Sequence, residues 1–259
     1  MTNSVIQALS AEHGRAVELI GSLTAEEWQA PSGCTGWRVQ DVIQHMASTF
    51  HTIADPASID GGSSAHAEEN AEVPVQARRD WSTAEVTAEY HEWAAKGIEA
   101  LTALQQPPMA DMVVPLADLG SHPMRLLANA IVFDHYCHLR HDIGAAIPRA
   151  AALPHDSLAL DATVEWMLAG LPQMCATALA GCTRGVNLSF DSSSSYALRP
   201  GGAGESWTIT SGSDSSLPTA ATTAHDFVSW GTKRTDWRHC GVELSDDAAA
   251  ATLDAINVI

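Results

Sequence analysis

The sequence is poor in basic residues. Its 259 residues include 13 Lys and Arg against 31 Asp and Glu, which gives a formal net charge of −18. A surface for nucleic acid or for an anionic membrane needs clustered Lys and Arg, so this balance argues against both as partners. The acidic excess favours solubility and places no limit on a small-molecule substrate.

Several other features are missing. No apolar run approaches the roughly 18 residues of a membrane span, and the N-terminus lacks the pattern of a secretory signal peptide. No GxGxxG, P-loop or GxSxG motif supports nucleotide binding or serine hydrolysis. The cysteines are odd in number, widely spaced and without a CxxC pair: Cys34, Cys137, Cys175, Cys182 and Cys240. This usage is typical of a reducing compartment, and we expect a soluble cytoplasmic protein.

What is present is mainly helical periodicity, with 46% hydrophobic residues available for a core. Apolar spacing and cap residues predict helices over residues 3–21, 39–53, 82–104, 121–144 and 155–181. The second of these has an apolar side formed by Val39, Ile43, Met46, Phe50 and Ile53. Between the helices we predict a surface loop over 55–80 and a small hairpin within 109–123.

The character of the chain changes after residue 185. Short strand-like segments alternate there with Gly, Ser and Pro turns, followed by helical segments near the C-terminus. The sequence therefore predicts a mainly α protein with two domains. Residues 1–182 form a helical bundle, and residues 183–259 form a small α+β domain.

The stretch IVFDHYCHLRHDI holds three histidines and two aspartates. At 100° per residue, an α-helix places Asp134, His138 and His141 on one face and turns His135 and Asp142 aside. A carboxylate and an imidazole one turn apart can hold one metal ion. The spacing is equally compatible with a solvated helix or with histidines that satisfy core polar groups. It does not identify a further ligand among the twelve histidines.

The segment LTAEEWQAPSGCTGWRVQDVIQH, which ends at His45, resembles the N-terminal signature of the mycothiol-dependent maleylpyruvate isomerase family. That family belongs to the DinB-like four-helix metalloproteins. The resemblance implies that His45 is a metal ligand and that Asp134 and His138 are the family's acidic and histidine ligands. The family more often has Glu at the first of these two places, and other DinB-like proteins have His. His141, followed by Asp142, stands where the family has Asp or Gln, so it is either a partner of the ligands or a substitute ligand.

The resemblance extends over nearly the whole chain. The segment AHDFVSWGTKR and the closing DAAAATLDAI resemble the small sterol-carrier-like domain that these isomerases carry. In the family an arginine near the active site follows such a stretch. The resemblance implies Arg234 for that role, with Arg238 as the alternate, while a surface arginine is the other interpretation.

The resemblance also implies a chemistry. A divalent metal, Zn²⁺ in the first place, is held by His45, Asp134 and His138 with coordination positions left open, although Ni²⁺, Fe²⁺ and Mn²⁺ suit the same ligands. Mycothiol is then the thiol cosubstrate, and the metal makes its thiolate accessible at neutral pH. The thiolate attacks an electrophilic small molecule, in an isomerase or an S-transferase, while an arginine binds a substrate carboxylate.

Two other functions fit the same sequence. Related bundles resemble metal-binding modules that regulate transcription factors, which makes a non-catalytic regulatory module the main alternative. A metal-free helical scaffold is the third hypothesis. The second domain favours the enzyme, because a regulator needs a partner-binding segment and none is evident.

Overall fold

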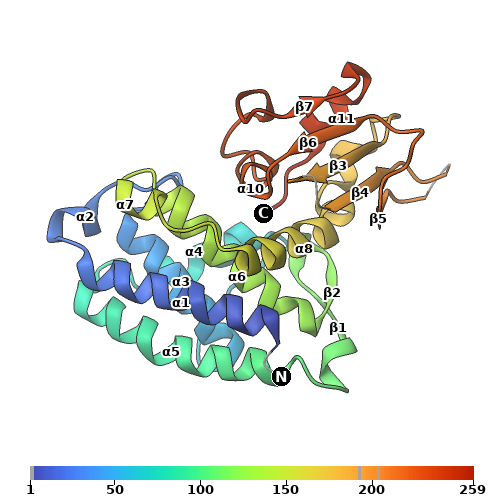
Figure 1. Ribbon diagram of the computed structural model, residues 1–259. Coiled ribbons are helices and arrows are strands. Elements are labelled where there is room, and N and C mark those ends of the chain that lie inside the picture. The colour runs from blue at the N-terminus through green and yellow to red at the C-terminus, as the bar shows by residue number, and fades with distance from the viewer. Residues whose placement is uncertain (1–2, 192–193, 203–204) are drawn as a thin grey trace. The chain divides into compact units, whose positions relative to one another are not determined.

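The computed structural model describes residues 3–191, 194–202 and 205–259 (Figure 1). The chain divides into two compact units, Met1–Thr163 and Val164–Ile259, and each is described here by itself. Helix α8, Ser157–Met174, runs through the limit between the units. The domain limits 1–182 and 183–259 remain a prediction. A helical first part and a small second part with a sheet confirm the expected fold class.

Four long helices build the first unit: α1 Ser4–Ser22, α3 Val39–Ala54, α5 Thr83–Ala103 and α6 Leu127–Cys137. A π-helix over His138–Ile143 continues the last of them. Helix α3 packs on α5, and α1 packs on both α6 and α5. Figure 1 shows α1 and α5 running beside one another in this bundle.

The apolar spacing of α3 determines which side of the helix is buried. Val39, Ile43, Met46 and Phe50 are completely buried, and Ile53 is half-buried at the end of the stripe. A Cβ atom added to Gly97 of α5 would lie 2.5 Å from the ring of Phe50, so only glycine permits this close approach. Burial of such a stripe stabilises the pair by about 1.5–3 kcal/mol for each large side chain.

The shorter elements bear out some expectations and correct others. The hairpin is present as β1 Val113–Pro115 paired with β2 Ser121–Pro123. Helix α6 begins at Leu127 and not at residues 121–123, because those residues pair in β2 and a 3₁₀ turn follows them. The predicted loop 55–80 contains helix α4, Ala67–Ala77. Only Pro74 and Val75 of α4 are buried, so its sequence shows little helical periodicity.

The remaining elements of this unit are α2 Ala25–Gln29, α7 Pro148–Ala151 and the 3₁₀ turns Met109–Asp111, Ala117–Leu119 and Met124–Leu126. Helix α2 has a capping box, because Thr24 accepts from the backbone N–H of Glu27 and the Glu27 carboxylate accepts from that of Thr24. No helix in the part of the chain that the structure describes is long and apolar enough to cross a membrane.

The second unit contains a five-stranded sheet in the order β5-β4-β3-β6-β7. Its strands are β3 Val186–Phe190, β4 Ser194–Arg199, β5 Thr208–Ser211, β6 Thr219–Thr222 and β7 Glu243–Leu244. Strands β3 and β6 are parallel, and the other pairs are antiparallel. The predicted Gly/Ser turns include residues 192–193 and 203–204, which lie outside the described residues.

Short helices complete the second unit: α9 Ala176–Leu179, α10 Ala224–Gly231, α11 Ala250–Ala255 and the 3₁₀ turns Trp237–His239 and Asp247–Ala249. The core between the sheet and α10 is aromatic. The ring of Phe227 lies 4.9 Å from that of Phe190 and 5.0 Å from that of Trp230. This is the small α+β part that the turn-rich sequence predicts.

Candidate metal centre

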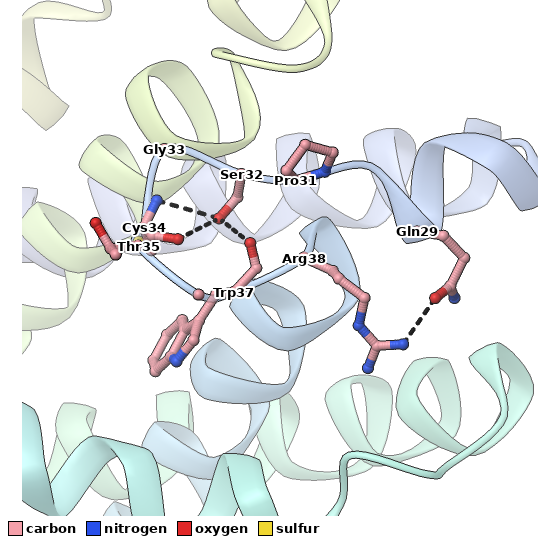
Figure 2. Close-up of a pocket in the computed structure, with 9 residues that line it drawn as sticks. Gln29, Pro31, Ser32, Gly33, Cys34, Thr35, Trp37 and Arg38 are labelled. Atoms are coloured by element: carbon pink, nitrogen blue, oxygen red, sulfur yellow. Dashed lines mark hydrogen bonds between the residues drawn. The ribbon is translucent and has the colours of Figure 1, made fainter.

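A tight loop leads into α3 and forms one wall of the site (Figure 2). The hydroxyl of Ser32 donates to the carbonyl of Trp37 at 2.9 Å and accepts from the N–H of Cys34 at 3.1 Å. The backbone of Gly33 donates to the carbonyl of Asp142 at 2.8 Å. A Cβ atom on Gly33 would lie 3.0 Å from Asp142, so glycine lets the loop pack directly on the π-helix.

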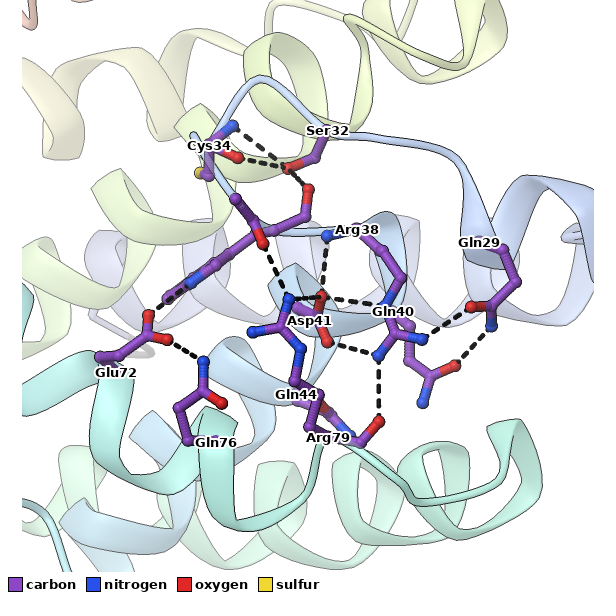
Figure 3. Close-up of polar contacts among 12 residues, drawn as sticks. Gln29, Ser32, Cys34, Arg38, Gln40, Asp41, Gln44, Glu72, Gln76 and Arg79 are labelled. Atoms are coloured by element: carbon purple, nitrogen blue, oxygen red, sulfur yellow. Dashed lines mark hydrogen bonds and ion pairs between the residues drawn. The ribbon is translucent and has the colours of Figure 1, made fainter.

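Arg38 and Asp41 define the first turn of α3 (Figure 3). The carboxylate of Asp41 accepts from the backbone N–H of Arg38 at 2.8 Å and from its guanidinium at 2.8 and 3.0 Å. This satisfies an N–H group that the helix itself leaves unpaired. His45 lies one turn beyond Asp41, so these contacts stabilise the helical turn that precedes it.

Replacing Asp41 with asparagine is expected to lower the free energy of unfolding by about 1–3 kcal/mol at pH 7, because the variant loses charge-assisted hydrogen bonds in a buried place. Burial by itself would raise the pKa of Asp41, but the hydrogen bonds and charge of Arg38 lower it below the ordinary value. A carboxyl with a depressed folded pKa stabilises the protein above its unfolded pKa of about 3.9 and loses this contribution as the pH falls through the folded value.

The difference in stability between wild type and Asp41→Asn should therefore shrink below about pH 4. Urea unfolding of both proteins at pH 7 and at pH 3 measures it. A difference of equal size at the two pH values would contradict this assignment.

The three residues expected as ligands come together from two helices. The Nε2 atom of His45, on α3, lies 2.9 Å from Oδ1 of Asp134, on α6. The Nε2 atom of His138, at the start of the π-helix, lies 3.4 Å from the same oxygen. The two imidazole rings are 4.9 Å apart and nearly perpendicular. Each side chain is about one-seventh exposed, at 13–16%.

These donors fit a divalent metal ion. Ligand atoms at about 2.0–2.2 Å from a tetrahedral Zn²⁺ lie roughly 3.3 Å from one another. The observed separations of 2.9 and 3.4 Å are close to that value, and one ligand atom from each of the three residues lies within 4.8 Å of the other two. Oδ2 of Asp134 is buried and accepts no hydrogen bond from the described residues. The carboxylate therefore has bonding capacity that the protein leaves unused.

In the ligand cluster, the carboxylate of Asp134 lies between the imidazoles of His45 and His138 and interacts with both electrostatically. Burial would raise the pKa of Asp134, but the positive charges of His138 and His45 hold it well below its ordinary value. Burial would likewise lower the pKa of His138, while Asp134 and Asp142 raise it well above its ordinary value. The carboxylate is thus kept ionised, which is the form that binds a metal.

The π-helix changes the predicted arrangement of the histidine-rich stretch. A π-turn is wider than an α-turn, so residues after Cys137 rotate relative to the face that carries Asp134. Asp142, which α-helical spacing turns aside, contacts Nδ1 of His138 through Oδ2 at 2.8 Å. His141, predicted on the ligand face, belongs to neither ligand cluster among the described residues. A carboxylate that accepts from the far nitrogen of a ligand histidine is the usual way such a ring is oriented.

Cys34 is a residue of the site that sequence reasoning did not identify. It is half-buried in the loop before α3, and its Sγ atom lies 4.0 Å from Nδ1 of His138. Together with His138 and Asp142 it forms a second group of possible ligands. This group meets the imidazole at Nδ1, whereas Asp134 meets it at Nε2, so the two groups lie at opposite edges of one ring. Cys34 lies in the sequence shortly before α3, the helix that carries His45, and this was the signal that could have placed it at the site.

Trp37 covers His45 from the loop side. Its ring lies 5.4 Å from the imidazole, and its indole N–H donates to Glu72 of α4 at 2.6 Å. The loop lines an open surface cavity of about 370 Å³, formed by Gln29 and residues 31–38. The cavity and the histidine cluster thus share a single loop as their wall.

The predicted arginine belongs to the second unit. Arg234 is exposed and follows α10, and its backbone N–H donates to the carbonyl of Ser229 at 3.0 Å. Arg238, the alternate, makes a bidentate pair with Asp254 at 2.7 and 2.9 Å. The role of Arg234 remains a prediction.

Comparisons with known proteins identify the family of the chain and the fold. A family model described as the mycothiol maleylpyruvate isomerase N-terminal domain matches residues 9–144. A search of curated proteins finds no match. The crystal structure of the mycothiol-dependent maleylpyruvate isomerase is similar, with a TM-score of 0.61, 13% identity and coverage of 95% of this chain and 93% of that chain. A histidine-to-alanine mutant of that enzyme gives a TM-score of 0.58, 12% identity and the same coverage.

At such low identity the structural likeness concerns the fold. The family match is more direct, because it spans more than half of the 259 residues and includes His45, Asp134 and His138. The chain therefore belongs to the family defined by the mycothiol maleylpyruvate isomerase N-terminal domain.

Proposed function

We propose that the protein is a metal-dependent enzyme that uses a low-molecular-weight thiol, mycothiol, either to isomerise an electrophilic small molecule or to transfer the thiol to it. The observation that carries the proposal is the convergence of His45, Asp134 and His138, with separations that suit one divalent ion, inside a family match named for a mycothiol enzyme. We propose Zn²⁺ in the first place, because two imidazoles and one carboxylate with a position left open are a ligand set of catalytic zinc sites.

The residues have distinct tasks in this proposal. His45 and His138 present Nε2 toward one point, and Asp134 presents Oδ1 between them. Asp142 orients the His138 ring from behind, and Trp37 covers His45. A bound divalent metal supplies stabilisation of a thiolate at neutral pH.

The chemistry of the cosubstrate sets the reaction class. Sulfur adds to an electrophilic carbon of the substrate. If the former double bond rotates and the thiol leaves, the result is isomerisation, and if the adduct is retained, the result is S-transfer. Arg234 is proposed to bind a substrate carboxylate, since guanidinium groups bind carboxylates in a bidentate way. We place the reaction in the cytoplasm, where the five free cysteines would stay reduced.

Replacing His45 with alanine is expected to remove the bound metal. Elemental analysis of the purified wild type should give about one equivalent of zinc per chain, and His45→Ala should give less than about a tenth, since a two-ligand remnant binds weakly. His91→Ala is the matched control, because His91 is exposed on α5 and lies outside the cluster. Equal zinc in wild type and His45→Ala would show that the site is wrongly assigned.

Loss of the electrophile, measured together with consumption of the thiol, tests the activity itself, because S-transfer consumes the thiol and isomerisation returns it. Wild type is assayed with mycothiol and a panel of electrophiles that includes maleylpyruvate, and His45→Ala is expected to lose turnover by at least about 10²-fold if the metal supplies the thiolate. Zinc binding without turnover on any electrophile would instead favour a non-catalytic metal-binding module. Absence of both metal and turnover would leave only a helical scaffold.

A further inference from the structure

Behind the candidate ligands, three helices contribute to one buried polar chain. Nε2 of His135, on α6, lies 3.1 Å from the hydroxyl of Tyr90, on α5. The same hydroxyl lies 3.3 Å from Nδ1 of His13, on α1. His135 and Tyr90 are completely buried, and His13 is half-buried. Buried polar side chains destabilise the fold unless each has a hydrogen-bond partner. The alignment of these three therefore calls for an explanation.

The direction of each hydrogen in the chain follows from its neighbours. Nδ1 of His135 faces two acceptors, the carbonyl of Ile131 at 3.1 Å and Oδ2 of Asp134 at 3.3 Å. Nδ1 therefore carries the hydrogen, and Nε2 is left as an acceptor. Tyr90 must donate to Nε2, and its oxygen accepts from Nδ1–H of His13. Burial raises the pKa of Tyr90 well above its ordinary value, so the hydroxyl keeps its hydrogen.

The buried polar chain from His13 through Tyr90 to His135 ends beside the carboxylate of Asp134, the candidate metal ligand. Oδ1 of Asp134 faces His45 and His138, whereas Oδ2 lies on the side of His135. The N–H of His135 favours an oxygen at this position electrostatically, although its hydrogen bond goes to Ile131. This contact favours the orientation in which Oδ2 faces His135 and Oδ1 faces the imidazole pair.

Apolar packing around His135 and Tyr90 strengthens the electrostatic contact between His135 and Asp134. The ring of Phe50 lies 5.0 Å from that of His135 and 6.1 Å from that of Tyr90. Phe50 is completely buried and packs against Gly97 of α5. In such an apolar environment the dipole of an N–H group acts with little screening.

We infer that Tyr90 and His135 are positioning residues that hold the Asp134 carboxylate in the orientation required for metal binding. The inference rests on the proposed metal site. It assigns a task to two buried polar side chains that do not themselves reach the three ligand atoms. Partners of this kind typically change metal affinity by about 10–100-fold when they are replaced.

The test is the affinity of the purified protein for Zn²⁺, measured by competition with a chromophoric chelator. Tyr90→Phe removes only the hydroxyl and is expected to bind Zn²⁺ about tenfold more weakly. His135→Gln, which places its amide toward Tyr90 and leaves no donor beside Asp134, should weaken binding at least as much. His135→Asn places an amide N–H where Nδ1 stands but loses the partner of Tyr90, and we expect it to bind Zn²⁺ about as Tyr90→Phe does and more tightly than His135→Gln.

Tyr136→Phe is the matched control. Tyr136 is also completely buried, on α6, with its ring against Arg140, but it lies outside the chain from His13 to Asp134. It should lose stability without losing affinity. The visible spectrum of the Co²⁺-loaded proteins provides a second readout, since a displaced carboxylate alters the coordination geometry.

If Tyr90→Phe and His135→Gln lose thermal stability but bind Zn²⁺ as wild type does, the chain serves only the core and the inference is wrong. If wild type itself binds no Zn²⁺, the proposed metal site fails, which is a different result. The two failures are therefore distinguishable.

Discussion

Replacing Glu12 with alanine is expected to lower the free energy of unfolding by about 3–5 kcal/mol, one of the largest effects of any single substitution in the bundle. Glu12 is completely buried on α1 and forms a bidentate pair with Arg140 of the π-helix, at 2.8 and 3.0 Å. Arg140 is only 1% exposed in its side chain. Without Glu12, its guanidinium keeps the carbonyl of Pro154 and the ring of Tyr136 but loses its counter-ion.

Urea unfolding measures the effect, and two controls interpret it. Glu92→Ala breaks an exposed pair with Lys96 and should cost less than about 0.5 kcal/mol. The double variant Glu12→Leu with Arg140→Leu should recover much of the loss, because Arg15, the other cation on Glu12, keeps Asp156 at 3.2 Å and no unpaired charge stays buried. A loss below about 1 kcal/mol for Glu12→Ala would mean that Arg140 finds water or another anion.

This pair also bears on the metal centre. Arg140 lies between His138 and Asp142 in the π-helix, and Glu12 anchors it to α1. The π-helix, in which Asp142 contacts His138 four residues before it, is thus tied to a helix more than a hundred residues away in sequence. Sequence periodicity contains no information on such a tie. The expectation for His141 and Asp142 counted the helical spacing from Asp134 and not from His138, which lies one turn before Asp142.

Other parts of the site were predictable for definite reasons. The apolar stripe of α3 determines which side of the helix is buried, and it leaves His45 at the edge of that stripe. Asp134 lies in α6, and His138 follows its last residue with a backbone N–H that still donates to the carbonyl of Asp134, so the α-helical spacing holds for this pair. The choice of His45 among twelve histidines came from the resemblance and not from spacing.

What could not be predicted depends on contacts between distant segments. The loop of Cys34 reaches His138 because Gly33 packs on Asp142, and neither residue indicates this in the sequence. Helix α4 buries only two residues, so a pattern of apolar spacing hardly exists there. The role of His135 was obscured for the same reason, since its partner Tyr90 belongs to another helix.

Replacing Asp134 with asparagine is expected to weaken Zn²⁺ binding by more than about 100-fold, because the loss of a ligand should exceed the effect of losing one of its supporting partners. The amide keeps the shape of the carboxylate but loses the charge that lies between His45 and His138. Chelator competition at pH 7 measures the change. His141→Ala is the matched control and should bind Zn²⁺ as wild type does, because His141 is outside both ligand clusters.

Asp134→Glu tests whether the short side chain is the right one for this backbone. The family motif more often carries Glu, yet Oδ1 of Asp134 already stands 2.9 and 3.4 Å from the two imidazole nitrogens. A glutamate would carry its carboxylate roughly 1.5 Å further, whereas ligand positions tolerate about 0.5 Å. We therefore expect Asp134→Glu to bind Zn²⁺ more weakly than wild type, although better than Asp134→Asn. If Asp134→Asn retained zinc and His141→Ala lost it, His141 would be the third ligand, and the π-helix would have to rotate when metal binds.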